Sequence, residues 1–290
     1  MSDFADFKRK SRSSSNLDEL SKKIQATSEK KSYKDDRFWR PELDKASNGY
    51  AVIRFLPAPP NEDLPWAKLY THGFQAKGGW FIENSRTTFG EKDPVSEMNS
   101  ELWNSGIESD KDIARARKRK LQYISNILVI SDPANPQNEG KIFLYKFGKK
   151  IFDKIQEAME PEFADEKAVN PFELWDGANF KLKVRKISGF INYDKSEFDS
   201  PSELFDGDDV QLEELWKKQY SLTAFTDPSN FKSYDELKQR LMDVVGDDIR
   251  SNDGTSAPTI QETSETLESK SESVAEETDA LDYFERLAKD

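Results

Sequence analysis

The chain has 290 residues, no cysteine and a formal charge of −12 at pH 7. Apolar residues make up 35% of it, below the roughly 45–50% usual for globular domains, so we expect one folded domain with unpacked tails. The absence of cysteine excludes disulfides and thiolate metal ligands, and a single histidine, His72, nearly excludes histidine-dependent nucleophilic catalysis. The longest apolar run is 127–130 and no signal peptide is recognisable, which favours a soluble intracellular protein.

The N-terminal 40 residues are basic, with 11 Lys and Arg against seven Asp and Glu. The segment 8–12 holds four of these basic residues and no acidic residue. A short amphipathic helix is predicted after it, because Leu17, Leu20 and Ile24 share one helical face. Such a helix is too short to be stable unless it docks on another surface. A disordered basic tail is the alternative.

The body of the chain is expected at 41–242, and between about 48 and 194 it consists mostly of short β-rich runs bounded by Gly, Pro and Asn. Strands are expected at 51–56, 67–74, 80–83, 123–131, 141–147 and 180–185. A helix is expected over 149–159, where Ile151, Ile155 and Met159 share a face, and further helices around 208–220 and 232–245. The pattern favours a mainly β fold with flanking helices, built on a small, partly open five-stranded Greek-key barrel.

The densest positive charge lies at 115–120, which holds five cations in six residues directly before a predicted strand. Aromatic residues are interleaved with these and later cations. A groove lined by cations and aromatic rings suits single-stranded nucleic acid, because the cations replace phosphate counterions and exposed rings stack on bases. The candidate binding residues are Trp103, Arg117, Lys118, Arg119, Lys120, Tyr123, Tyr145, Lys146, Lys149, Lys150, Phe190 and Tyr193. Aromatic residues in strands are more often core, so each ring could instead be buried.

Most of the negative charge lies in the last 48 residues. Residues 243–290 hold 14 acidic and four basic residues, a net charge of −10. Residues 1–242 hold 41 acidic and 39 basic residues, a net charge of −2. The segment 251–278 has few large apolar side chains, which predicts a flexible linker. The low overall isoelectric point is therefore a property of an acidic tail, and it does not exclude nucleic-acid binding by the body.

The end of the acidic tail carries large apolar side chains. Leu281, Phe284 and Leu287 are at helical spacing, with Tyr283 among them, in an acidic background. This pattern is typical of a short segment that folds into a groove of a partner protein. We predict that Leu281, Tyr283, Phe284 and Leu287 bind such a partner. The alternative is an acidic solubility tail with a few apolar residues by chance.

Other chemistry has little support in the sequence. Acidic groups at 35–36, 206–209 and 247–248 lie in polar, loop-like contexts without the spacing of a metal site. No phosphate-binding or dinucleotide-binding glycine motif occurs. We therefore expect no enzymatic activity. An acidic scaffold that recruits other proteins and an RNA-binding translational regulator remain the alternatives to a DNA-binding protein.

Ordered sequence blocks extend over half of the chain. They are NG at 48–49 with AVIRFLP at 51–57, HGF at 72–74, WFIE at 80–83, NILV at 126–129 with DPA at 132–134, NEGK at 138–141, FGKKI at 147–151 with DKI at 153–155, GANF at 177–180, and SGF at 188–190 with NYD at 192–194. In this order they resemble the T-even bacteriophage single-stranded DNA-binding, or helix-destabilising, proteins. The resemblance implies an oligonucleotide-binding (OB) barrel that coats single strands cooperatively in phage replication, recombination and repair, in the cytoplasm of the infected host.

The resemblance also implies roles for individual segments. The family's basic arm contacts the neighbouring protomer, which gives the cooperativity role to Lys8, Arg9, Lys10 and Ser11. The family's DNA-contacting positions fall here on Lys118, Arg119, Lys120, Tyr123, Tyr145, Phe190 and Tyr193, with Trp103 in the place of a tyrosine. Ile124 stands where the family has an indole. The acidic segment, here 243–290, is expected to bind phage polymerase, helicase-loading and recombination proteins.

One departure from the family concerns a metal. Relatives hold a structural zinc with one histidine and three cysteines. Here His72 remains, but the cysteine positions align with Ser85, Val95 and Met98, none of which supplies a thiolate. We therefore expect no zinc and no other cofactor, a hydrogen-bonded His72, and packing of the segment 84–106. The aromatic residues expected to provide this packing are Trp80, Phe81, Phe89 and Trp103.

Overall fold

The computed structural model describes residues 35–163 and 165–246. The predictions for the basic arm at 8–11 and for the apolar residues at 281–287 lie outside the described residues. The strands are β1 (Phe38–Trp39), β2 (Gly49–Phe55), β3 (Ala67–Ala76), β4 (Gly79–Asn84), β5 (Lys120–Ser131), β6 (Ile142–Phe147), β7 (Ala178–Ile187), β8 (Phe190–Asn192) and β9 (Glu197–Pro201). The α-helices are α3 (Pro94–Asn104), α4 (Glu108–Ala116), α5 (Lys149–Met159), α6 (Asp209–Lys217) and α7 (Tyr234–Val245).

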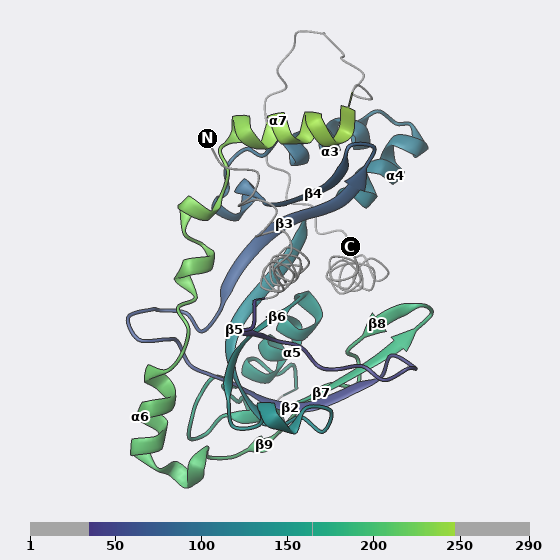
Figure 1. Cartoon of the computed structure of the whole chain (residues 1–290). Coiled ribbons are helices and arrows are strands. Elements are labelled where there is room, and N and C mark those ends of the chain that lie inside the picture. The colour runs from purple at the N-terminus through teal and green to yellow at the C-terminus, as the bar shows by residue number, and fades with distance from the viewer. Residues whose placement is uncertain (1–34, 164, 247–290) are drawn as a thin grey trace, which may run out of the picture. The chain divides into compact units, whose positions relative to one another are not determined.

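The strands form a mixed sheet whose main path is β1-β6-β5-β2-β7-β8, and Figure 1 labels all of these strands except β1. The β1–β6 pair is parallel and the other pairs are antiparallel. A mainly β fold with flanking helices is thus confirmed. A five-stranded Greek-key barrel is not confirmed, because the sheet has nine strands and does not close within 35–246. The twelve-residue β5 pairs with β3 near its start and with β2 near its end, so the β3–β4 hairpin joins the sheet outside its main path.

The main hydrophobic core lies between the sheet and α5. On β7, Phe180, Leu182 and Val184 are buried, as their alternation predicts. On α5, which spans the predicted residues, Ile151 and Ile155 enter the same cluster, and the helix packs on β5. These elements hold the start of α5 and the β7–β8 turn in fixed positions.

A second core cluster lies where α3 and α7 cover the β3–β4 hairpin (Figure 1). Phe81 from β4 and Leu237 from α7 are fully buried there. The hairpin turn approaches α7 so closely that Gly78 N–H donates to the carbonyl of Val244 at 2.7 Å. A Cβ atom on Gly78 would lie 2.3 Å from the carbonyl oxygen of Asp243, so only glycine fits.

Two helices in the described body were not predicted. α3 begins with the N-cap Asp93 and Pro94 in the first turn, a recognisable start signal. α4 is highly charged and buries only Ala114, so it lacks the apolar stripe by which helices are recognised. The basic run 115–120 therefore does not form a single segment before a strand. It spans the end of α4 at Ala116, a short link, and the start of β5 at Lys120.

Candidate nucleic-acid interface

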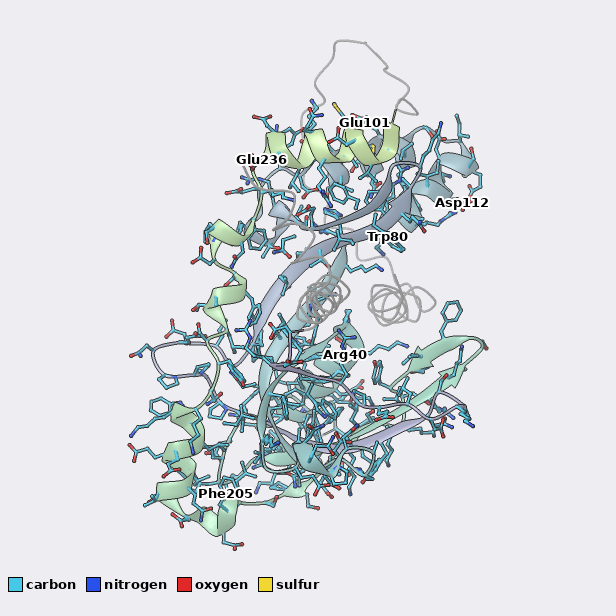
Figure 2. The ribbon with its side chains drawn as sticks, in the orientation of Figure 1. Arg40, Trp80, Glu101, Asp112, Phe205 and Glu236 are labelled. Carbon is cyan, nitrogen blue, oxygen red and sulfur yellow. The ribbon has the colours of Figure 1, made fainter. Side chains whose placement is uncertain are left out.

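The basic run 115–120 divides into cations used within the fold and cations that face solvent. Arg115 pairs with Asp112 at 2.5 Å and with Glu108 at 2.9 Å, all on α4, the helix that carries the labelled Asp112 in Figure 2. Arg117 places its guanidinium carbon 5.4 Å from the ring centroid of Phe74. Lys118 and Arg119 are exposed in the link to β5, and Lys120, which opens that strand, is half-buried. Positive charge is therefore concentrated at 117–120.

Two predicted aromatic contacts have open rings. Trp103, on α3, is 47% exposed, and the guanidinium carbon of Arg115 lies 5.3 Å from its ring centroid. Phe190, at the turn between β7 and β8, is 43% exposed. An exposed ring beside cations provides a surface for base stacking.

The three tyrosines predicted to contact DNA lie in the main core. Tyr123, Tyr145 and Tyr193 are 5%, 3% and 8% exposed. Tyr145 faces inward with Phe147, because alternate residues of β6 share a face. The structure thus differs from the expectation of open stacking faces at these three positions, and their contact with DNA stays a prediction.

Tyr123 belongs to a stack of aromatic rings that links β5, β6 and α5. Its ring centroid lies 3.9 Å from that of Phe152, with the planes 4° apart, and 5.8 Å from that of Phe147. Burial, and then the nearby Tyr70 and Asp153, raise the pKa of Tyr123. The phenol is therefore neutral at pH 7 and does not oppose a phosphate by charge.

The remaining predicted lysines differ in their surroundings. Lys149 pairs with Asp153 at 2.7 Å on α5, so its charge is locally balanced. Lys150 Nζ lies 3.4 Å from Asn192 Oδ1 on β8, two residues from Phe190. Lys146 Nζ lies 5.2 Å from the ring centroid of Phe38. The fold therefore brings Lys150 close to the strand that carries Phe190, a proximity that sequence spacing does not show.

The outward cations of β7 are paired with acidic residues. Lys181 pairs with Asp199 at 2.9 Å and Lys183 with Glu197 at 2.6 Å. Arg185 Nε donates to Asp194 at 2.9 Å. The alternation predicts this outward face correctly, but these ion pairs leave it with little net positive charge. It is not the basic groove.

The residues at the family's zinc position do not fit a zinc ion. His72 Nε2 lies 2.9 Å from Asp93 Oδ1 in the interior, and Ser85 Oγ donates to Asp93 Oδ2 at 2.9 Å. Val95 is buried in the second core cluster and Met98 packs against it. Within 35–163 and 165–246, no three His, Cys, Asp or Glu side chains are grouped as metal ligands would be.

The network around His72 and Asp93 is electrostatically strong. Burial alone would raise the pKa of Asp93, but the hydrogen bond and attraction to His72, with the Ser96 N–H and the Ser85 hydroxyl, lower it to about 2. The prediction of a hydrogen-bonded His72 is confirmed. The prediction of aromatic packing is confirmed for Phe81, which is fully buried, and Phe89 packs edge-on against Phe231 with the ring centroids 4.6 Å apart. Trp103 is 47% exposed and does not enter the core clusters.

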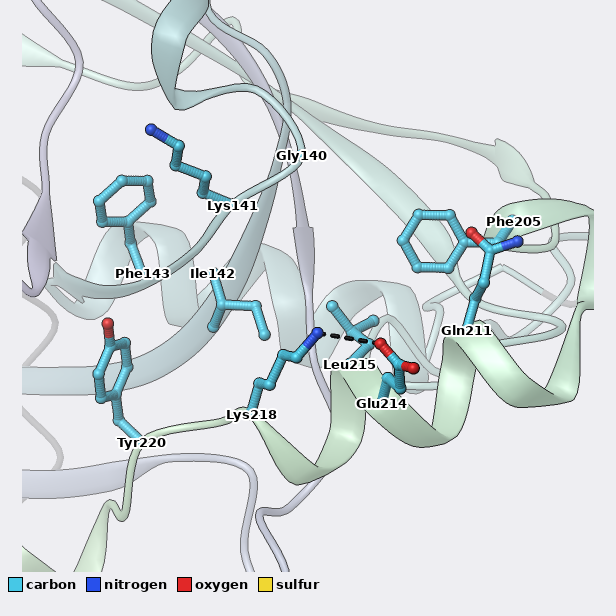
Figure 3. A pocket seen from close by; sticks show the side chains of 10 residues that line it. All are labelled: Gly140, Lys141, Ile142, Phe143, Phe205, Gln211, Glu214, Leu215, Lys218 and Tyr220. Carbon is cyan, nitrogen blue, oxygen red and sulfur yellow. Dashed lines mark hydrogen bonds and ion pairs between the residues drawn. The ribbon is translucent and has the colours of Figure 1, made fainter.

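A hollow between the start of β6 and α6 is a different kind of site (Figure 3). Its walls include the apolar Ile142, Phe143 and Leu215, and Lys218 pairs with Glu214 across its edge at 3.0 Å. It lacks the concentration of cations that a nucleic-acid backbone requires. The hollow therefore has no part in the candidate interface.

Comparison with known proteins agrees with the resemblance. The family model described as "gp32 DNA binding protein like" matches residues 47–245. The chain belongs to this family. The single-stranded DNA-binding protein of Enterobacteria phage T2 is 42% identical over 221 residues, which cover 74% of this chain and 72% of that protein. The protein of the same name from Enterobacteria phage T4 is 39% identical over 267 residues, 89% of this chain and 84% of that protein.

The matched family region, 47–245, covers nearly all of the described body, including 117–120 and the His72–Asp93 network. This member of the gp32-like family differs from the expected zinc ligand set at three positions, Ser85, Val95 and Met98. No helix within 35–163 or 165–246 is long and apolar enough to span a membrane.

Proposed function

We propose that this protein binds single-stranded DNA without sequence preference and without catalysis. The observation that carries the proposal is the concentration of cations at 117–120 in a chain that belongs to the gp32-like family. The exposed ring of Phe190, near Lys150, and that of Trp103 supply stacking surfaces. Duplex DNA hides the faces of its bases, so this combination favours single strands.

The finer roles follow from the resemblance. Binding is cooperative, with Lys8, Arg9, Lys10 and Ser11 contacting the neighbouring protomer. The acidic tail 243–290 recruits phage polymerase, helicase-loading and recombination proteins through Leu281, Tyr283, Phe284 and Leu287. The protein acts in replication, recombination and repair in the cytoplasm of the infected host. It needs no zinc or other cofactor.

The proposal includes the fold of the binding body. β1, β6, β5, β2 and β7 are consecutive neighbours in the sheet, and each contributes to the main core cluster. We infer that these five strands correspond to the OB barrel expected from the resemblance, in an open form. The β3–β4 hairpin and its helices are an addition to it.

Titration of tryptophan and tyrosine fluorescence with oligo-dT of increasing length tests the proposal. Affinity for single strands should fall with salt, with a slope of log K against log salt of about 0.7 per phosphate contact. Affinity for a duplex of equal length should be weaker. Equal affinity for both forms, or no salt dependence, would contradict the proposal and favour the scaffold. Tighter binding of oligo-rU than of oligo-dT would favour the RNA regulator.

A further inference from the structure

A cluster of three side chains joins Lys68 and Tyr70 of β3, which have no role in the interface described so far, to Arg119 in the link to β5. In the pairing of these strands, Lys68 lies opposite Tyr123 and Tyr70 lies opposite Leu121. Residues directly opposite each other project from the same face of a sheet. Arg119 precedes Leu121 by two residues, which brings it to this face as well.

The cluster is held together by contacts with one aromatic ring. The guanidinium carbon of Arg119 lies 4.3 Å from the ring centroid of Tyr70, and Lys68 Nζ lies 5.8 Å from it. Both cations are exposed and the ring is partly exposed. A guanidinium that lies over a ring keeps its N–H groups available for a phosphate, and its plane adds to the stacking surface.

Neither cation of the cluster is balanced by an acidic group within 35–163 and 165–246. The ion pairs of this body include Lys181, Lys183 and Arg185 on β7, but not Lys68 or Arg119. Lys68 therefore adds positive charge beside the run 117–120, which already includes Arg119. The surface is suited to an anion, unlike the outward face of β7.

Tyr70 is also fixed by its backbone. Its carbonyl accepts from Ser85 N–H at 2.8 Å, and its N–H donates to Thr88 Oγ1 at 3.0 Å. Both partners belong to the short 3₁₀ helix at Arg86–Phe89 and its N-cap. The strand carrying Tyr70 is thus paired on one side with β5 and held by this turn, so the ring is positioned before any ligand binds.

The family's indole position is not available for stacking in this chain. Ile124 is buried and packs with Ala67 and Leu69. Its side chain lies on the opposite face of β5 from Tyr123, because successive residues alternate. Any ring that takes over a stacking role must therefore come from another position, and Tyr70 lies on the adjacent strand.

We propose that Tyr70, Arg119 and Lys68 form a subsite for one nucleotide of a single strand. The base stacks on the layer formed by Tyr70 and the Arg119 guanidinium, and the adjoining phosphate is bound by Arg119 and Lys68. This assignment rests on the proposed function, because it supposes that a single strand follows the cations at 117–120. It adds Tyr70 and Lys68 to the contacts expected from the resemblance.

Tyr70→Leu tests the stacking, because leucine keeps apolar bulk and removes the ring. Affinity for oligo-dT should fall about five- to tenfold, the lower part of the range for one stacked base. Affinity for an abasic oligonucleotide of equal length and charge should stay within about twofold, since its phosphates remain and its bases are gone. Tyr70→Phe keeps the ring, so its affinity for both oligonucleotides should equal that of the wild-type protein.

Tyr50→Leu is the matched control, because Tyr50 is an exposed tyrosine on β2 beside the ion-paired face of β7. It should leave both affinities unchanged. Arg119→Lys gives a second test at an exposed residue, where folding is not in question: it keeps the charge, loses the planar group, and should weaken oligo-dT binding more than abasic binding.

Unchanged oligo-dT affinity of both Tyr70→Leu and Arg119→Lys, or equal losses for the two oligonucleotides, would overturn the subsite. The thermal midpoint of each variant shows whether it is folded. Failure of the proposed function gives a different result, since the unchanged protein would then show no preference for single strands.

Discussion

Asp93 holds together the segment around His72, Ser85 and Val95 by hydrogen bonds. Its Oδ1 accepts from the N–H groups of Val95 and Ser96 and thereby caps α3, while the same carboxylate binds His72 and Ser85. A buried carboxylate is stable only when such partners satisfy it. The network therefore connects β3, the turn after β4 and α3 through one side chain.

Asp93→Asn should lower the free energy of unfolding at pH 7 by about 1–3 kcal/mol, because buried donors lose a charged acceptor. The pKa of Asp93 is lowered from 3.8 to about 2 in the folded protein. Its charge therefore stabilises the fold above about pH 4, and this contribution is lost as the pH falls through 2. Urea unfolding should show a smaller difference in the free energy of unfolding between the original protein and the Asp93→Asn variant at pH 2.5 than at pH 7. As a control, Asp63→Asn at an exposed position should leave the free energy of unfolding unchanged at pH 7 and at pH 2.5.

Phe190 and Tyr145 should respond differently to truncation. Phe190→Ala removes an exposed ring and should weaken oligo-dT binding by about 1–3 kcal/mol while leaving the thermal midpoint nearly unchanged. Tyr145→Ala opens a cavity in the main core and should cost about 3–5 kcal/mol of stability. Parallel melting and binding measurements distinguish these effects. A stable Tyr145→Ala protein would show that its ring is not a core residue.

At the scale of elements, acidic residues balance the outward cations of β7. The run at 117–120 leaves α4 and enters β5, whereas the cations of β7 face acidic residues on or just before β9. Exposed ion pairs contribute little to stability, but they remove net charge from a surface. The outward face of β7 should therefore release few counterions when DNA binds.

Lys118→Gln should reduce the slope of log K against log salt for oligo-dT by about 0.7, the value of one phosphate contact. Lys183→Gln removes a cation that is already paired with Glu197 and should leave the slope unchanged. Titrations at four or more salt concentrations measure both slopes. A reduced slope for Lys183→Gln would show that its pairing with Glu197 does not neutralise this cation toward DNA.

The segment between β4 and α4 should be stable without a metal. Hydrogen bonds of Asp93 and the packing of Val95 provide the cross-links, and the ligand set for zinc is incomplete. Elemental analysis should find no stoichiometric zinc in purified protein, and a chelator should not change the thermal midpoint. About one zinc per chain would overturn this prediction.

At the scale of the whole molecule, charge is separated along the chain. The segment 243–290 carries −10 of the total −12, and the rest is close to neutral. Oppositely charged segments attract each other at low ionic strength, and salt screens this attraction. The acidic tail should therefore compete with DNA for the cations of the body.

Deletion of residues 251–290 should strengthen binding of oligo-dT at low salt, and the gain should disappear as the salt concentration rises. Association with polymerase and helicase-loading proteins should be lost in the same variant. Affinities measured at 20 mM and 500 mM salt test the first expectation. Unchanged affinity at low salt would show that the tail does not compete for the groove.

The sequence by itself determined the features that depend on neighbours along the chain. The alternation in β7, the helical period of α5 and the tail location of the negative charge are all local patterns. A pleated strand or a helix repeats every few residues, so its buried face can be recognised within a short window. The ordered family blocks likewise needed only the sequence.

Only the tertiary structure decided which faces meet. The sequence left open whether the inward face of β6, with Tyr145, is core or groove, and the packing of Trp39 and Phe55 against that ring makes it core. Asp93 reaches His72 across 21 positions, and Arg119 reaches Tyr70 across a strand pair. Such contacts depend on strand register and chain crossing, which bring together residues that no short window contains.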